Sequence, residues 1–271
     1  MFPQTLQTRI KHSIKAQLKI EHLITLLTVS AVFITWYIVT DLKIFSDVII
    51  PSPWKVYKTF IDIIAEGYKG SALSRHLLDS LERLLTAFGL VCITAVPIGL
   101  LSGYSSKVRA VFEPLVEFYR PLPPLAYYTM LVIWMGIGNS SKIMLLYLAG
   151  FAPVYLACIS GVMKIKQDYI YGAYTLGANK YQIFFYVVFP SCLPDIFTGL
   201  RTALGFSYTT LVAAEMVAAE TGIGWMVLDA SKFLLSDVIF VGILIMGVTG
   251  IILDALLKFI ENRLVPWKGK G

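Results

Sequence analysis

Charged residues are scarce in this chain: Asp, Glu, Lys and Arg make up 15% of its 271 residues, whereas hydrophobic residues make up 57%. A soluble domain of this size carries about 25% charged residues. The low charge and the mean hydropathy of +0.72 therefore predict a polytopic membrane protein. The net charge of +6 does not indicate nucleic-acid binding, because Lys and Arg lie at the ends of apolar segments, where they report membrane topology.

Cysteine is rare as well. Cys92, Cys158 and Cys192 lie in apolar surroundings, and no CxxC spacing occurs. An odd number of cysteines without that spacing supports neither a disulfide framework nor a metal site, so we expect buried, inert thiols. The three histidines are far apart in the sequence and are assigned no metal or proton-relay role: His12, His22 and His76.

Motifs for nucleotide hydrolysis and covalent catalysis are absent. The sequence contains no GxxxxGK[ST], no GxSxG and no HExxH, which are the patterns of the phosphate-binding loop, the serine nucleophile and the zinc peptidase. We therefore predict that the chain is not an enzyme and holds no cofactor. If ATP drives its activity, a separate polypeptide must hydrolyse the ATP.

Long uncharged runs predict six membrane-spanning helices, because a helix needs about 20 apolar residues to cross the hydrocarbon core. A basic, amphipathic segment over 1–22 comes first, and the first span follows over 23–40. Segment 41–75 is predicted to lie outside and to contain a helix over 54–66 that Gly67 ends. The remaining spans are expected at 84–101, within 113–137, and at 143–163, 196–218 and 238–257.

The third of these spans is expected to be interrupted. Pro121, Pro123 and Pro124 remove backbone donors and favour extended backbone before them, so we predict a break over 119–124. Irregular backbone at membrane depth persists only where protein buries it or where it lines a wet cavity. The break therefore lies either beside a translocation path or in an ordinary loop that enters the span.

The distribution of basic residues predicts the orientation. The basic segments are 1–22, the short loop with Lys107 and Arg109, the stretch 164–194 and the tail 263–271. The connections 136–141 and 221–237 lack this excess. Because positive charge near spans marks the cytoplasmic side, both termini and the stretch 164–194 are predicted to be cytoplasmic. The first apolar run lacks a cleavage site for a signal peptidase, so we expect it to remain as a span.

The stretch 164–194 is a polar interruption between two spans. Gly177 breaks a short helical pattern, Asn179 can cap a second short helix, and Pro190 and Pro194 are expected to end it. We predict a helix, turn and helix on the inner membrane surface. Either a partner protein docks on it, or it is an amphipathic loop without a partner.

This stretch resembles the coupling loop of permease subunits in bacterial ABC importers. The pattern of that loop is Glu-Ala-Ala, three residues, Gly, nine residues, an aliphatic residue, any residue and Leu-Pro. Ala173, Gly177 and Pro190 match the pattern and Val187 is a conservative match, whereas Tyr171, Gly172 and Phe189 differ from it. The resemblance implies that the following residues couple the chain to an ATPase: Tyr171, Ala173, Tyr174, Gly177, Ala178, Tyr181, Phe184 and Pro190.

From about Ile50 onward the chain is similar to permeases of the taurine, sulfonate and nitrate importers, and most of all to the taurine branch. The segments that carry this similarity include 118–126, 132–138, 151–154, 198–201, 211–215 and 263–267. The resemblance implies an all-α membrane protein with the type I ABC importer permease fold, whose core covers 76–262 and whose cytoplasmic tail is 263–271.

The same resemblance implies the partners and the transport cycle. The permease is expected in the bacterial inner membrane, surrounded by lipid. Its expected partners are a second copy of the chain, two cytoplasmic ATP-binding cassette subunits that bind ATP and Mg, and a periplasmic or lipid-anchored binding protein. Alternating access would then carry taurine, another sulfonate, nitrate or a small heterocycle such as a thiamine-precursor pyrimidine. A stand-alone secondary transporter or channel, or a structural subunit without a path, are alternatives of a different class.

The fifth predicted span carries two charges, fourteen residues apart, or about 21 Å along a helix. They lie on one helical stripe, which we predict to border a translocation path: Arg201, Gly205, Tyr208, Val212 and Glu215. A charge at the bilayer centre costs about 2.5–3.5 kcal/mol on insertion scales. Alternatively, both side chains extend to the headgroups. In the last span, Asp254 and Lys258 are spaced for an i,i+4 ion pair.

Overall fold

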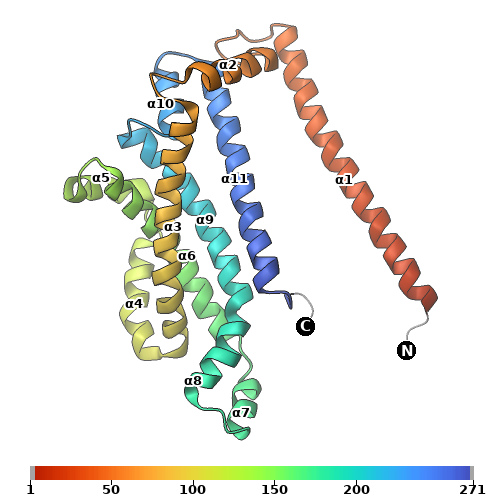
Figure 1. Ribbon diagram of the computed structural model, residues 1–271, viewed down its shortest axis with the longest axis vertical. Coiled ribbons are helices and arrows are strands. Elements are labelled where there is room, and N and C mark those ends of the chain that lie inside the picture. Colours follow the sequence, from red (N-terminus) through yellow and green to blue (C-terminus); the bar gives the residue numbers. More distant parts are fainter. Residues whose placement is uncertain (1–3, 269–271) are drawn as a thin grey trace.

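The computed structural model describes residues 4–268, which form long helices that run roughly side by side (Figure 1). Within this range the single β-bridge that occurs is the isolated pair Tyr68 and Ser71. The side chains of residues 4–20 and 22 are not described. The predicted amphipathic face of 1–22 and the last residues of the basic tail therefore lie outside the described residues.

The N-terminal part consists of one long helix and one short helix. Helix α1 (Gln4–Asp41) stands apart from the bundle along most of its length (Figure 1). Near its upper end, the Trp36 indole N–H donates to the Pro51 carbonyl (3.0 Å) and its ring stacks on Phe240. Helix α2 (Pro53–Glu66) follows, and its bounds agree with the prediction: the Ser52 hydroxyl caps its start, and Gly67 ends it with φ +78°.

The predicted break in the third span is present. Helix α3 (Leu73–Tyr104) crosses the bundle, α4 (Ser106–Tyr119) runs back along its lower half, and α5 (Pro124–Met135) extends sideways (Figure 1). The backbone over 120–123 is not helical because prolines remove its donors. Helix α6 (Asn139–Met163) then returns to the lower end.

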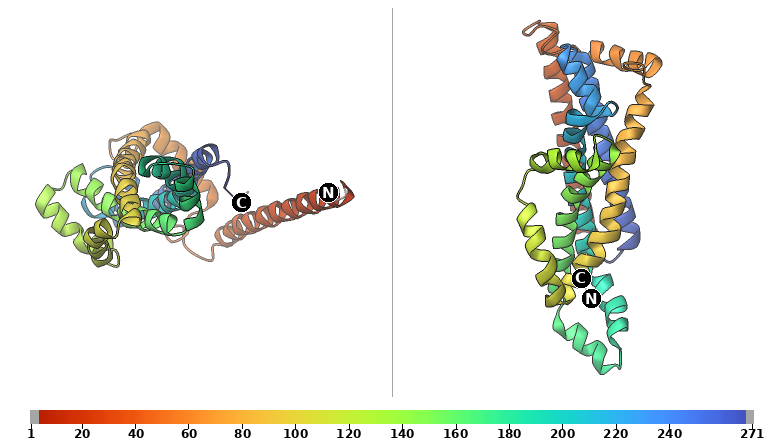
Figure 2. Two further views of the ribbon diagram at one scale, coloured as in Figure 1. Left: turned by 90° about the horizontal axis from the view of Figure 1, so that it is seen from below. Right: turned by 90° about the vertical axis from the view of Figure 1, so that its left-hand side faces the viewer.

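Helices α7 (Gln167–Thr175) and α8 (Lys180–Ile183) form a hairpin that projects at the lower end of the molecule (Figure 2). The prediction that Pro190 and Pro194 end the second helix is wrong. A π-helical turn, η1 (Phe184–Val188), joins α8 to α9 (Phe189–Ala218), with Pro190 in the first turn of α9 and Pro194 inside it. In the π-helical turn the Phe189 N–H donates to the Phe184 carbonyl, and this wider turn carries the helical path past Pro190, which has no N–H to donate.

The chain ends with α10 (Ile223–Lys232) and α11 (Ser236–Leu264). Among the described residues, five helices are long and apolar enough to cross a membrane: α1 from Leu23 onward, α3, α6, α9 together with the turns before it, and α11. Helix α5 is apolar but shorter. The all-α fold is confirmed, and five of the six predicted spans correspond to these long helices. In the place of the third, the structure has α4 and the shorter apolar helix α5.

Helix α6 lies at the centre and packs against both α3 and α9. Glycines permit this close approach. A Cβ atom added to Gly99 of α3 would lie 2.7 Å from Cys158 Cβ, and one added to Gly199 of α9 would lie 2.5 Å from Ala157 Cβ. A second, smaller core joins α2, α10 and α11 around Val56, Met226 and Val241. The main core thus fixes the relative positions of α3, α6 and α9.

Replacing Gly99 with Val is expected to lower the free energy of unfolding by about 1–3 kcal/mol, because overpacking separates α3 from α6. Gly89→Val is the matched control on the same helix, since nothing lies within 4 Å of a Cβ atom at that position. Unfolding titrations of both variants in detergent provide the measurement. Equal stability of the two variants would show that the α3–α6 contact is not tight.

Candidate functional site

The hairpin between α7 and α8 is defined by two local hydrogen-bonded caps. The Ala178 N–H donates to the Ala173 carbonyl (3.0 Å) and the Gly177 N–H to the Tyr174 carbonyl (2.9 Å), which is the Schellman arrangement. Gly177 has φ +82°, a value that favours glycine. Asn179 and Gln182 exchange side-chain and backbone bonds in a capping box at the start of α8. The predicted helix, turn and helix is confirmed.

This hairpin presents aromatic side chains to its surroundings. Tyr181 is 79% exposed, Tyr171 63% and Tyr174 43%. Ala173, Gly177 and Ala178 line a hollow of about 390 Å³ next to them. Exposed aromatic groups beside a hollow are typical of a docking surface for another protein.

Two of the predicted coupling residues instead connect the hairpin to the bundle. The half-buried Phe184 ring lies 6.3 Å from the Tyr104 ring at the end of α3, in an edge-to-face arrangement, and Pro190 lies in the first turn of α9. η1 and α9 form a continuous helical path from the hairpin into the bundle. The structure therefore brings together six of the predicted coupling residues at the hairpin and places the other two at its base.

Arg201 of α9 is paired with Asp254 of α11. The guanidinium Nε and Nη2 donate to Asp254 Oδ1 and Oδ2, both at 2.9 Å, in the planar two-bond arrangement that favours arginine. The pair predicted between Asp254 and Lys258 is absent from the ion pairs of the described residues. The cross-helix geometry with Arg201 prevails because it makes two charge-assisted bonds at once.

The middle of the predicted stripe faces a groove between α9 and α11. The groove has a volume of about 810 Å³ and is lined by Tyr208, Val212, Gly250, Asp254 and Lys258, among others. The Tyr208 hydroxyl donates to the Met246 carbonyl at 2.8 Å. Gly205 is exposed, and a Cβ atom added there would meet no atom within 4 Å.

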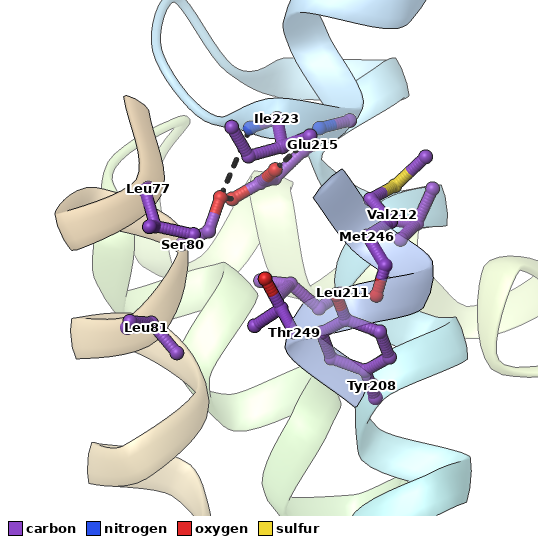
Figure 3. Close-up of a pocket in the computed structure, with 11 residues that line it drawn as sticks. Leu77, Ser80, Leu81, Tyr208, Leu211, Val212, Glu215, Ile223, Met246 and Thr249 are labelled. Carbon is purple, nitrogen blue, oxygen red and sulfur yellow. Dashed lines mark hydrogen bonds between the residues drawn. The ribbon is translucent and has the colours of Figure 1, made fainter. Parts of the chain in front are cut away.

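The upper end of the stripe is closed. Tyr208, Val212 and Glu215 also line a cavity of about 10 Å³ (Figure 3), which has room for about one water molecule. Glu215 is 1% exposed, and its Oε1 accepts hydrogen bonds from Arg83 Nη1 and Ser80 Oγ, both at 2.7 Å. Its Oε2 accepts the Gly224 N–H at 2.9 Å. The carboxylate is thus enclosed by three elements: α3, α9 and α10.

Arg83 extends this cluster to α6 and to the connection between α9 and α10. Its Nε donates to Asn139 Oδ1 (2.8 Å) and its Nη1 to the Thr221 carbonyl (2.9 Å). His76 Nδ1 accepts the Gly222 N–H (3.2 Å), and the His76 ring stacks on Trp225. We call Ser80, Arg83, Asn139, Glu215 and the backbone of 221–224 the upper polar cluster.

The partner of Glu215 was not predicted from the sequence. The second span was expected to begin at residue 84, just after Arg83, but α3 begins at Leu73 and buries Arg83 at 4% exposure. A buried charge in a membrane helix requires a partner of opposite sign. That rule indicates that Glu215 pairs with a Lys or an Arg, although the spacing of residues in the sequence does not select Arg83 from the other Lys and Arg residues.

Comparisons with known proteins agree with this architecture. The family described as binding-protein-dependent transport system inner membrane component matches residues 95–266. The chain is 40% identical over 244 residues to the taurine transport system permease protein of Escherichia coli K12, covering 90% of this chain and 89% of that protein. The chain belongs to this family.

Further relatives place the chain within a group of family members. The chain is 30% identical to a putative aliphatic sulfonates transport permease of Bacillus subtilis, over 90% of this chain and 87% of that protein. It is 29% identical to the nitrate import permease of Synechocystis, over 82% of each protein. The inward-facing MetNI methionine ABC transporter superposes with a TM-score of 0.55 at 18% identity, over 72% of this chain and 94% of that one. The chain is an ABC importer permease of the taurine, sulfonate and nitrate group, and its homologues are inner-membrane permeases.

Proposed function

We propose that this permease conducts taurine across the bacterial inner membrane and is driven by ATP hydrolysis on separate subunits. The 40% identity to the Escherichia coli taurine permease over 90% of the chain supports the choice of taurine within the group. The exposed hairpin supports a separate ATPase, because it offers a docking surface joined directly to α9.

The cytoplasmic side is assigned to the end that carries this hairpin. The start of α1 and the end of α11 lie toward the same end as α7 and α8 (Figure 1), in agreement with cytoplasmic termini. Two ATP-binding cassette subunits that bind ATP and Mg would dock there, and a binding protein would deliver taurine on the opposite side. The exposed apolar face of α1, with Leu26, Val32 and Tyr37, suits lipid and a second copy of the chain.

The stripe on α9 is assigned to the translocation path in two parts. Tyr208 and Val212 line the groove, and Arg201 is bonded to Asp254, which also lines it. A small polar cargo would contact these residues and the exposed Gly205. Glu215 forms the upper limit of the path, because the upper polar cluster encloses its carboxylate. ATP-driven movement of the hairpin would open and close this path through α9.

Uptake into proteoliposomes tests the proposed function. The permease, its ATPase subunits and the binding protein loaded with labelled taurine are expected to give uptake at least about tenfold above that without ATP. Unlabelled nitrate at the same concentration should not compete. Taurine accumulation by the permease alone would support a secondary transporter instead, and ATP-driven uptake of nitrate without taurine would overturn the choice of substrate.

A further inference from the structure

The Arg201–Asp254 ion pair is unusual because it is only half buried. The Arg201 and Asp254 side chains are 36% and 49% exposed, in contrast to 5% and 1% for Arg83 and Glu215. Both residues lie inside helices that are long and apolar enough to span a membrane. Charges exposed to hydrocarbon there are costly, so the open side of this pair is expected to face water or polar cargo.

The open side adjoins the groove between α9 and α11. Asp254 lines this groove together with Lys258, and its walls are otherwise largely apolar. Arg201 and Asp254 bring one cation and one anion to the same site, and each retains unused hydrogen-bonding positions. A guanidinium has five N–H donors and a carboxylate about four acceptor sites, and two of each are used here.

We propose that the Arg201–Asp254 pair is a transit site for a zwitterion. This inference rests on the proposed function. The sulfonate of taurine would bind the guanidinium of Arg201, and its ammonium would bind the carboxylate of Asp254. A zwitterion engages both members of the ion pair, whereas a simple sulfonate engages the guanidinium and leaves the carboxylate of Asp254 without a cargo partner. Lys258 lines the same groove and adds one positive charge there, so the preference for aminosulfonates comes from the contact between the cargo ammonium and Asp254.

The variants Arg201→Gln, Asp254→Asn and the double variant distinguish a cargo site from a helix-to-helix contact. In proteoliposomes with ATPase and loaded binding protein, we expect each to lower taurine uptake per ATP hydrolysed by about tenfold or more. The double variant should remain as low as the single variants, because both cargo contacts are lost. Lys69→Gln is the control: it removes an exposed cation that pairs with Asp229 (3.2 Å) at the other end of the molecule, and it should retain wild-type uptake.

A structural role would give a different result in the double variant. If the pair only holds α9 against α11, neutralising both partners removes the unbalanced charge that harms each single variant. Wild-type uptake per ATP in the double variant would therefore overturn the inference. If the wild-type complex takes up no taurine, the proposed function itself fails, which is a separate result.

A binding measurement on the wild-type complex covers the case in which the variants do not assemble. The permease–ATPase complex in nanodiscs, without nucleotide or binding protein, is mixed with taurine or with ethanesulfonate, which lacks the ammonium group. Saturation-transfer NMR is expected to give a signal at least about fivefold larger for taurine. Equal signals from the two compounds would overturn the inference, because they would show that Asp254 does not contribute to recognition.

Discussion

Glu215→Gln is expected to lower the free energy of unfolding by about 3–5 kcal/mol, the loss that follows when one partner of a buried ion pair is removed. Arg83 is 4% exposed and would remain charged and enclosed without its carboxylate. The change also weakens the bonds from Ser80 and the Gly224 N–H, because a neutral amide is a poorer acceptor than a carboxylate. Denaturant titration of the purified protein measures the effect.

A matched control and a double-mutant cycle separate the ion pair from the general effect of removing a carboxylate. Glu220 is exposed and lies five residues further along, so Glu220→Gln should change stability by less than about 0.5 kcal/mol. The double variant Arg83→Met, Glu215→Leu is expected to lose about 1–3 kcal/mol less free energy of unfolding than the sum of the losses in the two single variants. Additive losses, or equal stability of Glu215→Gln and Glu220→Gln, would contradict the proposed role of the pair.

The second large effect is expected at the hairpin turn. Gly177→Trp should lower ATP-driven uptake by about tenfold or more, while the permease remains in the membrane in normal amount. No atom lies within 4 Å of a Cβ atom at Gly177, so an indole there does not collide with this chain. It would project from the docking surface and obstruct the ATPase. Uptake, ATP hydrolysis and copurification of the ATPase provide the measurements.

Backbone strain requires its own control. A non-glycine residue at positive φ costs about 1–2 kcal/mol, and Gly70→Trp carries a similar cost, because Gly70 has φ +79° and equally open surroundings. Gly70 lies between α2 and α3, away from the hairpin. Uptake should therefore remain normal in Gly70→Trp. If both variants lose uptake equally, strain is the cause, and if Gly177→Trp transports normally, the hairpin is not the docking site.

Features that depend on near neighbours in the sequence were predictable. The turn at Gly177, the cap at Asn179 and the bounds of α2 follow from hydrogen bonds and dihedral angles within a few residues. The break before Pro124 follows from the donors that proline lacks. The prediction for Pro190 failed because the sequence did not indicate the π-helical turn that lets the chain continue into α9.

The ion-pair partners of Arg201 and Glu215 were not predictable from the sequence. Helical periodicity predicted that Arg201 and Glu215 share one stripe of α9, but it could not name their partners, which come from other helices: Asp254 is 53 residues from Arg201, and Arg83 is 132 residues from Glu215. The sequence by itself determined that Arg201 and Glu215 are costly in a membrane helix and must border a path or extend to the headgroups, because the cost of a charge in hydrocarbon is a property of that residue alone. Only the tertiary structure decided which partners they have, since the packing of α3, α9 and α11 sets the distances over which charges act.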